Sequence, residues 1–188
     1  MPQAFGQSAN GERARNIANH SFPGRFGKVR AKAVELEFTT KVDGEKSTVE
    51  VTIQSLVPHN LPLPHPAWSR LVLDLTILGK NLKKFYGEQR FYERVYADKN
   101  GSETVLDFEA VKILKDTLLA PEEKRIETFT FDTPSDAPSM DVTVSLGYAP
   151  VHGPDDLLKA IEDEATLGKK DQAFRKVQII KKKQNVTL

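Results

Sequence analysis

Strict alternation of apolar and polar residues over short stretches is the feature that most limits the folds open to this chain. VELEFT at residues 34–39 and TVEVTI at residues 48–53 both follow this period of two. Such a period buries every second side chain and leaves the others in water, which is the pattern of a half-buried β-strand. Asp43 and Gly44 lie between the two stretches and are a strong turn signal. The sequence therefore predicts a hairpin over residues 34–57.

Further stretches of this kind follow along the chain, with turn signals between them. The other expected strands lie at SRLVLDLTIL (69–78), within 104–114, around Ile126, Phe129 and Phe131, at SMDVTVSLGYA (139–149) and within 174–183. Val72 stands on the polar face of its strand, so part of that face should be covered. The aromatic segment 80–104 fits either a strand pair or a short helix with a strand. About seven short strands predict a mainly β protein, an antiparallel β-sandwich of the Ig-like or Greek-key type.

One short C-terminal helix is expected at PDDLLKAIEDEA (154–165). Pro154 suits the first helical turn, and the aspartates that follow it are favoured by the helix dipole. We therefore divide the chain into an N-terminal arm (1–30), a sandwich domain that includes the helix (31–168), and a C-terminal strand with a basic tail (169–188).

Composition excludes several classes of function. The formal net charge is +1, from 27 basic and 26 acidic residues, which argues against charge-driven binding to nucleic acid or to an anionic membrane. The chain contains no cysteine, so disulfides, thiolate chemistry and the C-x-x-C-H attachment of c-type haem are excluded within it. No apolar run approaches the length of about eighteen residues that a membrane span needs. Residues 1–15 lack the apolar core of a secretory signal.

Two of the four histidines stand in bends that prolines and glycine make stiff. His20 lies in NHSFPG (19–24), and His59 lies in PHNLP (58–62), at the start of a loop with four prolines in ten residues. Such a loop cannot continue a strand ladder, so it should be a stiff crossing between strands. A stiff bend loses little further entropy when its histidine binds a metal, which suits a ligand supplied from a distance.

The order of these motifs is similar to that in the C-terminal β-sandwich region of bacterial multihaem c-type cytochromes. The resemblance covers about residues 16–165. It is carried by NHSFPG, PHNLPLP, SRLVLDLTI, DKNG, FEAVKILKDT, APEEKR, FTFDTP and VTVSLGY, in that order. The departures from the family pattern are Pro58 in place of a glycine, Leu63-Pro64 in place of Thr-Gly, and the absence of every haem-attachment motif.

The resemblance implies a role for each of the two histidine motifs. In such cytochromes both histidines serve as axial ligands of haems that are attached elsewhere in the polypeptide. His20 and His59 would therefore be axial ligands to haem iron, and Phe22 would pack on a porphyrin face. The expected function is a haem-free β-sandwich module of, or associated with, a multihaem c-type cytochrome. It would support electron transfer in the periplasm or outside the cell, without enzymatic activity and with no covalent cofactor in this chain.

Other readings of the residues stay open. The aromatic segment 85–96 is compatible with a protein-, peptide- or glycan-binding or adhesion module, and a homo-oligomer is compatible with every reading. His20 and His59 could also hold a free, non-covalent haem between them. His65 and His152 are expected to be solvated histidines, and no motif supports a hydrolase.

Overall fold

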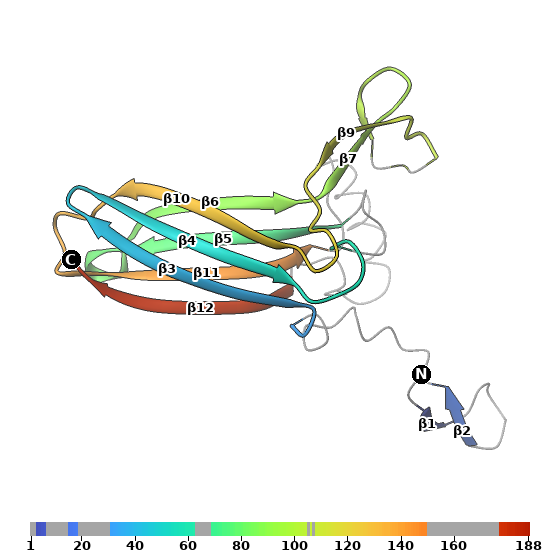
Figure 1. The fold of residues 1–188 in the computed structure, drawn as a ribbon, viewed down its shortest axis with the longest axis horizontal. Coiled ribbons are helices and arrows are strands. Elements are labelled where there is room, and N and C mark those ends of the chain that lie inside the picture. Colours follow the sequence, from blue (N-terminus) through green and yellow to red (C-terminus); the bar gives the residue numbers. More distant parts are fainter. Residues whose placement is uncertain are drawn as a thin grey trace, which may run out of the picture.

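The computed structural model describes residues 3–6, 15–18, 31–62, 69–104, 106, 108–149 and 177–188. Within these ranges it is a sandwich of two antiparallel sheets, with a smaller sheet that projects from one end (Figure 1). The prediction of a mainly β, antiparallel sandwich is confirmed. The helix expected at 154–165 lies outside the described residues. A separate pair of short strands, β1 (Gln3–Gly6) and β2 (Arg15–Ala18), is antiparallel.

Two sheets of three and four strands make the sandwich, and a three-stranded sheet projects from it. The first sheet has the order β10 (Lys124–Asp132), β4 (Lys46–Ser55), β3 (Val34–Asp43). The second has the order β12 (Val177–Thr187), β11 (Ser139–Ala149), β5 (Arg70–Leu78), β6 (Lys84–Tyr92). The projecting sheet has the order β8 (Glu103–Thr104), β7 (Arg94–Ala97), β9 (Lys112–Asp116).

The topology is of the Ig-like type. β4 pairs with β3 and with β10, the chain then crosses to β5 in the second sheet, and β11 lies between β5 and β12. The predicted hairpin is β3–β4, in register from Val34 opposite Ser55 to Asp43 opposite Lys46. Gly44 turns this hairpin at φ +59°, a backbone conformation that favours glycine.

The core lies between the two sheets and follows from the alternation in the sequence. Residues at every second position of β4, β5 and β11 are fully buried, and those between them face outward. The most deeply buried apolar side chains are Val49, Val51, Ile53, Leu73, Leu75, Ile77, Leu119, Phe129, Met140, Val142, Val144 and Leu146. Val72, on the outer face of β5, is only 3% exposed, so the predicted covering of that face is confirmed.

Strand β10 departs from the apolar stripe that Ile126, Phe129 and Phe131 suggested. Phe129 and Phe131 are buried, but Ile126 is 54% exposed, because a period of two puts even-numbered residues of this strand on the outer face. The inner positions before Phe129 are taken by Glu127 and Arg125. Charged side chains therefore stand where a regular sandwich strand would place apolar ones.

These charges meet the inner face of β6 and close one open side of the sandwich. Tyr86 of β6 stacks on Phe131 with ring centroids 4.9 Å apart. The Tyr92 hydroxyl donates to Glu127 Oε1 at 3.0 Å, and burial raises the pKa of Tyr92 well above its usual value. Burial, together with a hydrogen bond to Glu88, also raises the pKa of Tyr86, to about 12. Tyr86 and Tyr92 of this aromatic segment therefore cover the core.

Strand β12 is the last strand of the second sheet, and its ladder is made with β11. The three consecutive lysines 181–183 lie inside this strand and are exposed to solvent. Beyond the ladder, Gln184 approaches Thr40 of the facing sheet, at 3.5 Å between their side-chain oxygens.

Candidate functional site

His59 stands on the loop that follows β4, at the end of the sandwich from which the small sheet also projects. Its side chain is exposed. Nδ1 of the imidazole lies 3.0 Å from the carbonyl oxygen of Asn60. A carbonyl oxygen only accepts hydrogen bonds, so this contact requires the proton on Nδ1 and leaves the lone pair on Nε2. Metal-binding histidines are commonly oriented by such a bond through the nitrogen that does not bind the metal.

The loop is held on both sides of His59 by backbone hydrogen bonds. Before His59, the amide of Ser55 donates to Glu123 and that of Leu56 donates to Ala33, each at 2.8 Å. After His59, Leu61 and Leu119 exchange a pair of backbone hydrogen bonds of 2.9 and 3.0 Å, which form an isolated antiparallel bridge. The stiffness that the prolines predict is therefore reinforced by pairing that the sequence does not indicate.

The segment that carries Leu119 is itself fixed, by Arg125 at the inner face of β10. The guanidinium donates to the carbonyls of Thr117, at 2.9 Å, and Leu118, at 3.1 Å. It also donates through Nε to Glu123 Oε1 at 2.7 Å, while the other oxygen of this carboxylate accepts from the Ala120 amide at 2.7 Å. Arg125 and Glu123 thus hold the two sides of the turn between β9 and β10 together.

A buried carboxylate sits at the root of the projecting sheet. Glu93 is only 7% exposed, and its carboxylate contacts Lys115 Nζ at 2.8 Å and Arg70 Nη1 at 3.7 Å. A backbone hydrogen bond also ties the chain together here: the Thr117 amide donates to the Glu93 carbonyl at 2.9 Å. The Arg70 guanidinium also lies 4.4 Å from the centre of the Phe91 ring. Glu93 is therefore a structural anchor in this arrangement.

The projecting sheet carries exposed apolar side chains of its own. All five residues of β9 are exposed, so this strand has no buried face. The exposed apolar residues of this part of the chain are Phe108, Val111, Ile113 and Leu114.

The structure gives no position for the other two predicted site residues. His20 and Phe22 lie outside the described residues, as do His65 and His152. What the structure does place is the start of β3, because Val34 pairs with Ser55 and the Ala33 carbonyl binds Leu56. The chain therefore enters the sandwich at the end where His59 stands.

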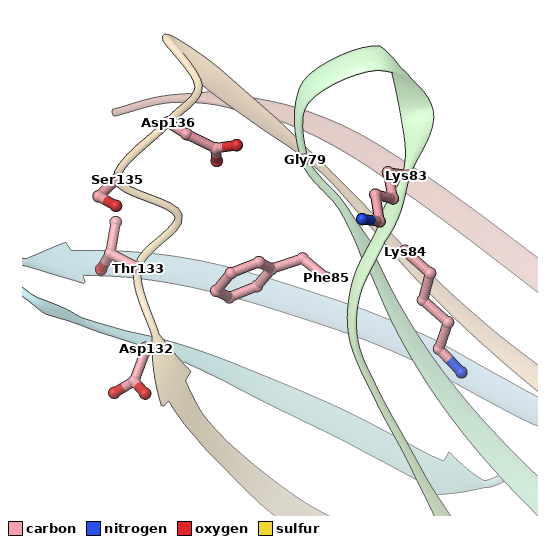
Figure 2. A pocket seen from close by; sticks show the side chains of 8 residues that line it. All are labelled: Gly79, Lys83, Lys84, Phe85, Asp132, Thr133, Ser135 and Asp136. Atoms are coloured by element: carbon pink, nitrogen blue, oxygen red, sulfur yellow. The ribbon is translucent and has the colours of Figure 1, made fainter.

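An open pocket of about 530 Å³ lies at the opposite end of the sandwich, between the turn before β6 and the segment after β10. Figure 2 shows the Phe85 ring between these two segments, with the side chains of Lys83 and Asp136 directed toward the same space. Phe85 is 45% exposed. The sequence signal for this pocket was the aromatic segment, of which Phe85 is the exposed member here.

Two general features bear on the class of protein. Among the residues that the structure describes, no helix has the length and apolar character needed to cross a bilayer. The same residues contain no group of three or more histidine and carboxylate side chains placed to hold a metal ion.

Comparison with known proteins gives a likeness of fold. No family model matches the chain, and no curated protein matches it. Among solved structures, a penta-heme cytochrome c552 from Thermochromatium tepidum aligns with a TM-score of 0.68 and 21% sequence identity, over 87% of this chain and 42% of that one. The C-terminal domain of wzt aligns over 83% of this chain and 72% of its own at 7% identity, with a TM-score of 0.42. The chain therefore spans less than half the length of that cytochrome and shares the fold of the matching part.

Proposed function

We propose that this chain is the haem-free β-sandwich module of a multihaem c-type cytochrome, or of a partner of one, and that it supplies axial histidine to haem iron. His59 is the ligand that the structure supports, and His20 is the ligand that the sequence motif adds. The module would act in the periplasm or outside the cell, without catalysing a reaction itself.

One observation carries the proposal: an exposed imidazole on a loop that is fixed on both sides of it. The Nδ1 contact with Asn60 would leave Nε2 as the nitrogen that binds a metal. The bonds at Ser55, Leu56 and Leu61 keep the loop in place before any metal binds. Little ordering entropy then remains to be lost on coordination. The alignment with a penta-heme cytochrome over 87% of this chain adds support, together with the order of the sequence motifs.

The residues of this chain would hold and orient the ligand, and they would supply no redox chemistry. His59, together with His20 from the sequence motif, would hold a haem iron, which would supply one-electron transfer when bound. The Asn60 carbonyl would hold the ring and its proton in place, and so tune the donor strength of Nε2.

Titration with a haem c peptide tests the proposal directly. In this probe the haem is covalently bound, the peptide's own histidine fills one axial position, and the other position is open. We expect the intact chain to convert the probe to a low-spin spectrum, seen as a shift of the Soret band. His59→Gln should weaken or abolish the shift, and His20→Gln tests the second ligand in the same way.

The remaining histidines provide matched controls for this titration. His65→Gln changes the same residue type within the same proline-rich loop, and His152→Gln changes it in a stretch beside Gly153 and Pro154. Both should leave the shift unchanged. A wild-type chain that leaves the probe spectrum as it is in buffer would contradict the proposal. A His59→Gln variant that titrates like the wild type would remove His59 from it.

A second candidate is a binding module, favoured by the exposed Phe85 ring with Lys83 and Asp136 beside it. An aromatic surface between opposite charges suits a short zwitterionic peptide. NMR titration with such peptides would separate the two candidates, because this one requires shifts confined to residues around Phe85.

A further inference from the structure

We infer that Arg125 is a positioning residue for His59, and that it acts through the bridge between Leu61 and Leu119. The inference rests on the proposed function of His59 and extends it to a residue on another strand. Arg125 itself has no contact with the imidazole among the described interactions.

The first step is the hydrogen bonding of Arg125 to the segment 117–123, which precedes β10. One guanidinium binds the carbonyls of Thr117 and Leu118 and the carboxylate of Glu123, over 2.7 to 3.1 Å. These bonds need several donors at fixed angles, which a planar guanidinium provides and a lysine ammonium does not. The guanidinium carbon also lies 5.4 Å from the ring centre of the buried Tyr92, so the side chain is packed as well as bonded.

The second step is the backbone pairing that joins this ordered segment to the loop of His59. Leu118 and Leu119 are adjacent, so fixing the Leu118 carbonyl fixes the backbone that exchanges two hydrogen bonds with Leu61. Leu119 is fully buried, which prevents the segment from moving outward without loss of core packing. Leu61 is two residues from His59, and the other end of the loop is tied to Glu123 through Ser55. On both sides of His59 the loop is therefore bonded to the segment that Arg125 and Glu123 order.

The sequence contains this arrangement only as the motif APEEKR, whose last residue is Arg125. An arginine at an inner strand position is costly unless it is bonded. The carbonyls of Thr117 and Leu118 and the carboxylate of Glu123 provide these bonds for Arg125.

The test compares Arg125→Lys with Arg90→Lys in the full chain. Arg90 is a close control: it is also an inner-face arginine at the same side of the sandwich, it pairs with Glu88 at 2.6 Å, and it lies 5.1 Å from the Phe129 ring centre. Both variants keep the positive charge, so each loses only the planar set of N–H donors of the guanidinium. Native-state hydrogen exchange of the Leu61 and Leu119 amides is the first readout, and haem c peptide affinity is the second.

We expect Arg125→Lys to accelerate exchange at Leu61 and Leu119 by at least about tenfold, with the core amides of β5 and β11 unchanged. We expect its affinity for the haem c peptide to fall by about tenfold, with the same low-spin spectrum at saturation. Arg90→Lys should change neither. Glu123→Gln provides a milder second variant, since it keeps the two carbonyl contacts, and it should show a smaller acceleration at the same amides.

The outcomes separate this inference from the proposed function. Wild-type exchange at Leu61 in both Arg125→Lys and Glu123→Gln would overturn the inference. Equal acceleration by Arg90→Lys would also overturn it, because the effect would then be general destabilisation. If the wild-type chain does not bind the probe, the proposed function fails, and the exchange result still decides whether Arg125 orders the loop.

Discussion

Replacing Tyr92 by phenylalanine should lower the stability of this protein at neutral pH and should reduce the stability that it loses at alkaline pH. The Tyr92 side chain is 1% exposed and donates to a carboxylate, Glu127, at 3.0 Å. A hydrogen bond to a charged group contributes about 1.5 to 3 kcal/mol to stability. We therefore expect Tyr92→Phe to lower the free energy of unfolding at pH 7 by about this amount.

Above pH 10 this stability difference between the wild type and Tyr92→Phe should shrink. Burial raises the pKa of Tyr92 in the folded chain, and the negative charge of Glu127 raises it further. The folded state therefore holds the phenolic proton more tightly than the unfolded state does. The stabilisation linked to that proton is complete below the unfolded pKa of about 10 and is lost as the pH rises beyond it. The loss approaches about 1.4 kcal/mol for each further pH unit. Between pH 10 and 12 the wild type should therefore lose about 2 to 3 kcal/mol relative to Tyr92→Phe.

Urea unfolding followed by circular dichroism, at pH 7, 10, 11 and 12, measures both parts of this prediction. Tyr86 and the lysines titrate in both proteins, so their contributions cancel in the difference. Parallel loss of stability in the two proteins above pH 10 would refute the reasoning, because it would show that the Tyr92 proton is not retained by folding.

Three further predictions concern the core, the root of the projecting sheet and the ligand loop. Phe129→Ala should lower the free energy of unfolding by about 3 to 5 kcal/mol in the same urea assay, since it empties a fully buried site beside Arg90; a loss below about 1 kcal/mol would contradict the core position. Glu93→Ala leaves Lys115 and Arg70 without their shared carboxylate, so limited proteolysis should cut the projecting sheet first, and an unchanged pattern would argue against the anchor role. His59→Gln should lose the Soret shift with the haem c peptide while its urea midpoint stays within error of the wild type, because the ring is exposed to solvent.

Much of the sandwich could be predicted because its strands are simple amphipathic segments. In β3, β4, β5 and β11 most inward positions are apolar, the exceptions being Thr40, Ser47 and Ser55, so period two alone assigned both the strand and its buried face. The same rule failed to describe β10 and β6, where Arg125, Glu127, Glu88 and Arg90 face inward at the side of the sandwich. Arg90 pairs with Glu88 on its own strand and Arg125 with nearby Glu123, whereas Glu127 contacts Arg90 and Tyr92 across two strands that are distant in sequence. No local pattern can express this second kind of contact.

The candidate site divides in the same way. The stiffness of the His59 loop could be read from Pro58 and Pro62, since proline restricts the chain wherever it stands. The bridge from Leu61 to Leu119 could not, because it joins segments about sixty residues apart through backbone atoms that every residue possesses. For His20 and Phe22 the sequence motif remains the only basis for the predicted role.

The lysines inside β12 have a consequence for how the molecule behaves in a crowded solution. A terminal strand of a sheet offers unpaired backbone groups to any other strand, and this is a common start of fibril growth. Three neighbouring positive charges at 181–183 would face the same charges on an approaching copy and repel it. The sheet can thus end at an open strand while the chains stay apart from one another.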